Sequence, residues 1–313
     1  MKFNPIRLFA ATLSFVFFLP NIAVADPQIS NLPVESGRLQ VHAGEYREEG
    51  EPVADVLFFH GYGDRFSNHE ALFKEWIKAG VRVIAFDLPS HGGTEGGPGF
   101  DLDNLSFTDL QRIAAKVEKN YIENPKRPLI LAGWSLGGLL AARIAQSTNL
   151  SQLSRIPSGL LLLAPGVSVN WCVGNWVCQI TNETLTHDEK LYQRPITPAS
   201  PIYRLGFAAH LLESASLAWH EGLPPNIPTM VVVAGDDDRY VNSLDLLSWI
   251  STQRSEFHAN IQAIQCPGAR HEVDNELPEY GGFQVRASTA QFLKDAAIGS
   301  NTIILIDGPC LRF

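Results

Sequence analysis

The chain has 313 residues and a formal net charge of −9 at pH 7, because 33 aspartates and glutamates outnumber 24 lysines and arginines. This length supports one large domain with a sizeable core. The acidic balance, without basic clusters, argues against a nucleic-acid-binding protein.

Residues 1–25 have the composition of a signal peptide. Lys2 and Arg7 precede an apolar stretch at 8–19, and Ala-Val-Ala at 23–25 offers a cleavage site before Asp26. The alternative is a membrane anchor, but about 12 apolar residues are too few to cross a bilayer comfortably. We therefore expect an exported protein, either periplasmic or secreted.

Apolar runs and their spacing predict an alternation of strands and helices. Strands are predicted near residues 38–42, 54–59, 81–86, 128–133, 158–164, 228–234 and 261–265. Helices are predicted near residues 67–79, 107–120, 136–147, 242–254 and 279–296. This order is typical of an α/β fold with a mostly parallel sheet covered on both faces.

The alternation stops between residues 166 and 226, which indicates an insertion. The predicted organisation is therefore a signal peptide at 1–25, a core formed by 26–165 and 227–313, and the insertion at 166–226.

Residues 133–137 read Gly-Trp-Ser-Leu-Gly and lie between an apolar run and an Ala- and Leu-rich helix. A strand that leads through Gly-x-Ser-x-Gly into a helix is typical of a nucleophile elbow. The serine needs a strained turn, and side chains at the two glycine positions would collide with neighbouring backbone. The positive end of the helix dipole favours negative charge at the serine. The pattern therefore predicts that Ser135 is a nucleophile.

An acid and a base follow Ser135 at the ends of later predicted strands. Three consecutive aspartates follow the run at 228–234, and the Gly-x-x-Asp spacing from Gly235 selects Asp238. Asp237 is the second choice, while a turn or capping role suits Asp236 and Asp237. After the run at 261–265, a loop carries His271. We expect His271 to take the proton of Ser135 and Asp238 to hold the imidazole.

Five ordered motifs carry a family resemblance. They are His-Gly-Tyr-Gly-Asp at 60–64, the segment 86–96, the elbow, Gly235 to Asp238, and Gly-Ala-Arg-His-Glu at 268–272. Over residues 38–296 the chain resembles the monoglyceride lipase and lysophospholipase group of α/β-hydrolases, which are similar to S33 serine aminopeptidases. Two positions depart from this group: Trp134 replaces its usual histidine, and Ser90 replaces the first glycine of Gly-His-Gly.

The resemblance implies an oxyanion hole and a helical cap. The oxyanion donors would be the backbone N–H groups of Tyr62 and Leu136, and one such donor contributes about 3 kcal/mol. The cap would be the insertion at 166–226. Its apolar side chains suit an acyl chain, since each buried methylene contributes about 0.8 kcal/mol. For most of them, packing in the cap's own core is the favoured interpretation.

Three tryptophans are candidates for contact with substrate. Trp171 and Trp176 lie near the start of the insertion, and Trp134 precedes the nucleophile. A transient contact of the cap with a membrane surface stays open.

Four cysteines in an exported chain favour disulfides over metal ligation. The favoured pairs are Cys172 with Cys178 and Cys266 with Cys310, and four buried thiols are the alternative. The nine histidines show no zinc-ligand spacing, so we expect no metal.

The sequence thus predicts a serine hydrolase of carboxylic esters that acts through an acyl-enzyme and needs no cofactor. Its expected substrates are small esters or single-chain lipids, such as a monoacylglycerol or a lysophospholipid. The alternatives are a peptidase of the proline-iminopeptidase type and a catalytically silent binding protein. The peptidase would need acids in the cap to hold an ammonium group, and Glu183, Asp188, Glu189 and Glu213 are available.

Overall fold

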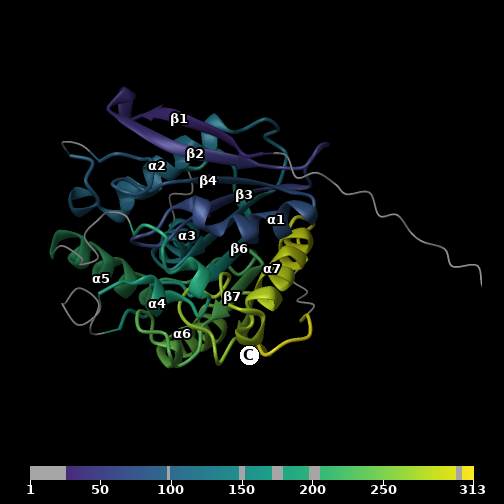
Figure 1. Cartoon of the computed structure of the whole chain (residues 1–313). Helices are drawn as coiled ribbons and strands as arrows, with labels where there is room; N and C mark the ends of the chain where they lie inside the picture. The colour runs from purple at the N-terminus through teal and green to yellow at the C-terminus, as the bar shows by residue number, and fades with distance from the viewer. Residues whose placement is uncertain (1–25, 97–98, 148–151, 171–178, 197–204, 301–304) are drawn as a thin grey trace, which may run out of the picture.

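A computed structural model describes residues 26–96, 99–147, 152–170, 179–196, 205–300 and 305–313. Its strands form one sheet in the order β1-β2-β4-β3-β5-β6-β7-β8-β9 (Figure 1). The bounds are β1 Gln28–Val34, β2 Leu39–Tyr46, β3 Ala54–Phe59, β4 Val81–Phe86, β5 Leu129–Trp134, β6 Pro157–Leu163, β7 Thr229–Val233, β8 Ile261–Gln265 and β9 Leu311–Arg312. Strands β3 to β8 pair in parallel, whereas β1, β2 and β9 pair antiparallel at the two sides.

The parallel strands form the centre of the core. All residues of β3, β4, β5 and β7 are buried, which explains why these strands are almost entirely apolar apart from Asp55, Arg82 and Thr229 at or near their starts. The structure confirms the predicted mostly parallel sheet, and the predicted bounds of 54–59, 81–86 and 261–265 agree with β3, β4 and β8.

Helices cover both faces of this sheet. The α-helices of the described residues are α1 Glu70–Lys78, α2 Phe107–Asn120, α3 Leu136–Gln146, α4 Asn182–Leu185, α5 Leu205–His220, α6 Ser243–Ser255 and α7 Gly282–Ala296; α4 and α5 belong to the insertion and not to the layers on the sheet. Helices α1 and α7 pack against each other, while α3 contacts α2 and α5 on the other side of β6 (Figure 1). Among the described residues, no helix is both long and apolar enough to cross a membrane.

The insertion between β6 and β7 contributes α4 and α5 to the described structure. Phe207 and Leu211 of α5 are buried, and the ring of Phe207 stacks on Tyr62 with centroids 4.9 Å apart. The side chain of Trp219 donates a hydrogen bond to the carbonyl oxygen of Val167, 2.8 Å away. Helix α5 therefore lies against the loop that follows β3.

Two strands and two helix starts differ from the sequence predictions. Strand β1 contains Asn31 and Pro33 and is mostly exposed, so it has no apolar run, and β9 has only two residues. Tight 3₁₀ turns at Phe66–His69 and Pro278–Tyr280 precede α1 and α7, so both helices begin three residues later than predicted.

A disulfide joins Cys266 to Cys310, as the sequence predicts. Their Cα atoms lie 4.0 Å apart and the two residues are separated by 44 positions. The bond ties the chain before β9 to the end of β8, close to the loop that carries His271. Cys172, Cys178, Trp171, Trp176 and residues 1–25 lie outside the described residues.

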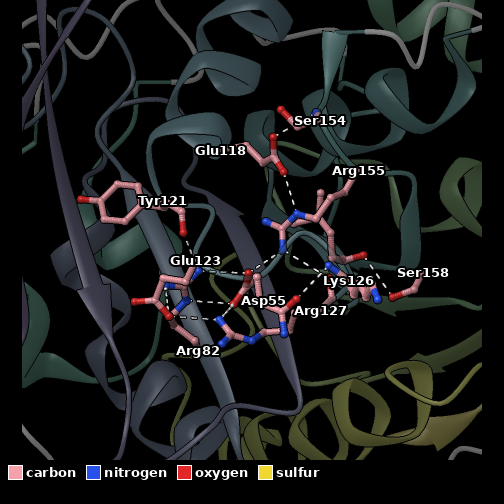
Figure 2. A network of polar contacts seen from close by, with 12 residues as sticks. Asp55, Arg82, Glu118, Tyr121, Glu123, Lys126, Arg127, Ser154, Arg155 and Ser158 are labelled. Atoms are coloured by element: carbon pink, nitrogen blue, oxygen red, sulfur yellow. Dashed lines mark hydrogen bonds and ion pairs between the residues drawn. The ribbon is translucent and has the colours of Figure 1, made fainter.

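A buried ionic network holds the amino-terminal ends of the parallel strands. The Asp55 carboxylate, at the start of β3, accepts hydrogen bonds from Arg82, Arg127 and Arg155, as Figure 2 shows. Arg155 also bonds Glu118 of α2, 2.8 Å away. Burial alone would raise the pKa of Asp55, but the guanidinium groups hold it below its ordinary value. One carboxylate thus links β3, β4, α2 and the segments before β5 and β6.

We expect Asp55→Asn to lower the free energy of unfolding by about 3–5 kcal/mol, because it leaves buried guanidinium charge uncompensated. Glu123→Gln is the matched control, since Glu123 pairs with Arg82 but its side chain is 41% exposed. Its cost should stay below about 1 kcal/mol. Urea unfolding of both variants measures the difference, and equal losses would contradict this account of the network.

Candidate active site

Ser135 occupies the turn between β5 and α3. Its φ of 54° and ψ of −117° lie outside the ordinary regions for a residue with a side chain. A Cβ atom at Gly133 would lie 2.3 Å from the carbonyl oxygen of Gly137, and one at Gly137 would lie 2.0 Å from that of Phe59. Only glycine fits at both positions, so the motif glycines have the steric role that the sequence predicts.

Ser135, His271 and Asp238 form a continuous chain of hydrogen bonds. Nε2 of His271 lies 2.7 Å from Oγ of Ser135, and Nδ1 lies 2.8 Å from Oδ2 of Asp238. His271 is 2% exposed, whereas Ser135 is partly exposed. Each of the three residues follows the end of a parallel strand, which brings them to one edge of the sheet.

The structure separates Asp238 from the two aspartates before it. Asp236 and Asp237 are exposed, whereas Asp238 is buried. The second oxygen of Asp238 accepts hydrogen bonds from the backbone N–H groups of Tyr240 and Val241, at 2.8 and 3.0 Å. These donors stabilise the carboxylate and fix the oxygen that faces His271.

The loop after β3 lies directly beside Ser135. A Cβ atom at Gly61 would be 3.1 Å from that of Ser135 and 2.5 Å from the ring of Trp134. Tyr62 follows in this loop and is buried, while Leu136 is the first residue of α3. Both predicted oxyanion residues therefore belong to segments that border the serine.

Two buried histidines, whose roles the sequence analysis missed, hold this loop. Nε2 of His60 accepts the backbone N–H of Leu88 at 2.9 Å, and Nε2 of His91 accepts that of Gly63 at 3.1 Å. Burial lowers the pKa of His60, and burial with the nearby His60 lowers the pKa of His91 to about 3. Neutral rings can accept these bonds, whereas doubly protonated rings cannot. The motif at 86–96 draws attention to His91, but it does not indicate that His91 binds the backbone N–H of Gly63.

Trp134 is buried beside His271. It is 1% exposed, and its indole N–H donates to the carbonyl oxygen of His271 at 2.9 Å. The described residues that line a narrow cavity at the serine do not include it; they are Ser135, Leu136, Gly166, Val169, Leu211, Tyr240 and Val241. Glu183, Asp188, Glu189 and Glu213 are also absent from this lining.

A second cluster of charged groups lies behind Trp134. Nε2 of His69 is 2.7 Å from Asp64 and Nδ1 is 2.7 Å from Asp274. Burial alone would lower the pKa of His69, but the two carboxylates raise it well above its ordinary value. Burial alone would likewise raise the pKa of Asp64, but the charge of His69 lowers it. The ring of His69 is therefore held as a cation between two carboxylates.

Asp64, His69 and Glu272 bring three ligand-type atoms within 4.8 Å of one another, which is short enough to consider a metal site. Both nitrogens of His69 already face aspartates, and Arg194 makes a two-pronged ion pair with Glu272. Ion pairs within the protein therefore account for this group of residues.

The geometry at Ser135 suits one kind of chemistry. A partly exposed hydroxyl, a histidine that can take its proton and a buried carboxylate that orients the histidine are the parts of an activated serine nucleophile.

The sequence model of the Alpha/beta hydrolase family matches residues 56–280, and the chain therefore belongs to this family. An uncharacterized abhydrolase domain-containing protein of Dictyostelium discoideum is 30% identical over 116 residues. That match covers 37% of this chain but only 11% of the Dictyostelium protein.

Two solved structures show the same fold. A monoglyceride lipase of Saccharomyces cerevisiae superposes with a TM-score of 0.67 at 16% identity, over 89% of this chain and 99% of the lipase. A monoacylglycerol lipase of Paleococcus ferrophilus gives 0.63 at 20% identity, over 82% and 99%.

The His69 cluster should make stability depend on pH in a defined direction. Because the pKa of His69 is higher in the folded than in the unfolded protein, its protonation stabilises the fold. This stabilisation is complete below the unfolded-state pKa of about 6.5, and it is lost as the pH rises through the folded-state pKa. Asp64 has a lowered pKa, so its contribution is present above about pH 3.9 and is lost at lower pH. The stabilisation should therefore be largest between these two values.

We expect the difference in unfolding free energy between wild type and His69→Gln to be largest near about pH 5 and to shrink towards about pH 9. Denaturant unfolding at several pH values measures it. His220→Gln, at an exposed histidine of α5, should show no such trend. A difference that does not vary with pH would contradict a cationic His69.

Proposed function

We propose that this protein is a serine hydrolase that cleaves carboxylic esters through an acyl-enzyme. The observation that carries the proposal is the chain of hydrogen bonds from Ser135 through His271 to Asp238, at 2.7 and 2.8 Å. Membership of the Alpha/beta hydrolase family and the ester-cleaving names of the two lipase structures support it.

In the proposed reaction, Oγ of Ser135 attacks the ester carbonyl carbon while Nε2 of His271 takes the hydroxyl proton. The negative oxygen of the tetrahedral intermediate accepts hydrogen bonds from the backbone N–H groups of Tyr62 and Leu136. His271 returns the proton to the leaving alkoxide, and an acyl-serine remains. Water then gives a proton to His271 and attacks the acyl-serine; His271 returns this proton to Oγ of Ser135 as the carbonyl–Oγ bond breaks, which releases the acid and restores the hydroxyl.

Asp238 keeps one tautomer of His271 and stabilises the imidazolium that forms in both halves of the reaction. Two backbone N–H groups donate to its other oxygen, which stabilises its negative charge and holds the carboxylate in place.

We further propose that the substrate is a single-chain lipid such as a monoacylglycerol or a lysophospholipid. Val169 and Leu211 from the insertion join Val241 around Ser135, so apolar side chains border the proposed nucleophile. Residues 166–226 would then act as the cap over the acyl chain. The composition of residues 1–25 supports export of the protein by a signal peptide.

We expect Ser135→Ala to reduce ester turnover by about three orders of magnitude or more, and His271→Ala by a similar factor, because these groups act as a unit. Turnover of a p-nitrophenyl ester measures both. If Ser135→Ala keeps more than about a tenth of the wild-type rate, the covalent mechanism is wrong.

Asp238→Asn should be far more damaging than either Asp236→Asn or Asp237→Asn, since only Asp238 contacts His271. The loss should reach about 10⁴-fold in kcat. The two neighbouring variants provide matched controls, because each removes one charge in the same turn. A reversed ranking would assign the acid elsewhere in the turn.

Substrate class is tested with p-nitrophenyl esters of increasing acyl length and with proline p-nitroanilide. A lipid hydrolase should gain kcat/KM with chain length, because each methylene that is buried contributes about 0.8 kcal/mol. A peptidase would instead favour the proline anilide over every ester. A flat response to chain length would contradict the lipid assignment and leave ester cleavage itself intact.

A further inference from the structure

Trp134 connects the proposed nucleophile to the proposed base. Its backbone is bonded directly to Ser135, and its indole N–H donates to the backbone carbonyl of His271 at 2.9 Å. The indole ring also packs on the imidazole of His271, with centroids 5.1 Å apart. A single side chain therefore contacts both the peptide group and the ring of the base.

His271 needs such a contact because it lies in a loop. The segment between β8 and α7 contains turns and no strand, so no sheet ladder fixes the backbone at His271. Its peptide group is held by two hydrogen bonds: the carbonyl accepts from Trp134, and the N–H of Glu272 donates to the carbonyl oxygen of Leu185 at 2.8 Å. Its two ring nitrogens meet different partners, Ser135 on one side and Asp238 on the other. A rotation of the peptide group would move both nitrogens at once.

The surroundings of Trp134 leave its ring little freedom. His69 packs against the indole with centroids 5.4 Å apart, and two hydrogen bonds of 2.7 Å fix the His69 ring. Gly61 closes another side, since a Cβ atom there would lie 2.5 Å from the indole. Asp274, one of the two partners of His69, belongs to the same loop as His271. The indole is therefore enclosed by groups that are themselves held in place.

We propose that Trp134 is a positioning residue for the base: its indole N–H fixes the peptide group of His271, so that the imidazole stays between Asp238 and Ser135. The Asp64–His69–Asp274 cluster holds the indole in the orientation that makes this bond. The inference rests on the proposed function, since it concerns how the base of that reaction is held.

If Trp134 had a purely structural role, its substitution would lower stability without a specific loss of kcat. The chain contains a matched control for this comparison. Trp249 of α6 is also fully buried, and its indole N–H also donates to a backbone carbonyl, that of Ala218, at 2.9 Å. Trp134→Phe and Trp249→Phe remove the same kind of bond from the same kind of environment. The two variants should lose similar amounts of stability.

The test compares kcat and KM of the two variants on a short p-nitrophenyl ester, with urea unfolding of each. We expect Trp134→Phe to lower kcat by about 10- to 100-fold, because a misplacement of about 1 Å has an effect of this size. KM should change by less than about twofold, because the indole does not line the described cavity. Trp249→Phe should leave both constants unchanged.

Equal kcat values for the two variants would overturn the proposal, and so would a change confined to KM. A double-mutant cycle with Asp238→Asn adds a second criterion. If Trp134 acts through His271, its substitution should cost less in the Asp238→Asn background than in the wild type, because both changes disturb one imidazole. If the fold-loss in kcat of the double variant equals the product of the two single losses, Trp134 acts independently of His271.

If Trp134→Phe does not fold, the proposal is tested on the wild-type protein by NMR. Its ¹⁵N-indole NMR signals are assigned from Phe variants at the other tryptophans and followed while a p-nitrophenyl phosphonate modifies Ser135. The Trp134 signal should shift and the Trp249 signal should not; an unchanged Trp134 signal overturns the inference. If Ser135→Ala also stays active, the proposed function itself has failed, whereas an inactive Ser135→Ala confines the failure to Trp134.

Discussion

The close approach of α3 to the end of β3 is the constraint on which the site depends. A side chain at Gly137 would lie 2.0 Å from the carbonyl oxygen of Phe59, so the helix can begin here only because this residue has none. The same approach places Ser135 beside the loop that starts at His60. This backbone contact therefore sets the distance between Ser135 and the loop, and the bonds of His60 and His91 then hold the loop there.

The strongly apolar part of the fold could be predicted from the sequence because its strands are buried on both faces. Strands β3 and β4 are apolar apart from Asp55 and Arg82, and their bounds could be predicted to the residue. Strand β1 could not, since it lies at the side of the sheet and alternates exposed with partly buried positions. It pairs with β2 as an antiparallel hairpin, but its polar and proline-containing sequence gives no apolar run by which a strand could be recognised.

The residues of the candidate site likewise fall into those that could be predicted from the sequence and those that could not. Ser135, Asp238 and His271 could be predicted because each follows a recognisable strand, and the fold brings these ends together. The partners of His69 could not, because Asp274 lies 205 positions away and nothing near either residue marks the contact. The orientation of Trp134 could not be predicted either. A tryptophan beside a predicted nucleophile suggests contact with substrate, and nothing in the sequence indicates that its indole N–H donates to the carbonyl of His271.

The disulfide between Cys266 and Cys310 implies an order of events during biosynthesis. The segment with His271 follows soon after Cys266. The disulfide, however, can form only after Cys310 has been synthesised, 44 residues beyond Cys266. All the parallel strands precede this point, so the sheet can assemble while both thiols are free. The disulfide therefore attaches the carboxy-terminal segment to a sheet whose parallel strands, serine turn and histidine loop all precede that segment in the chain.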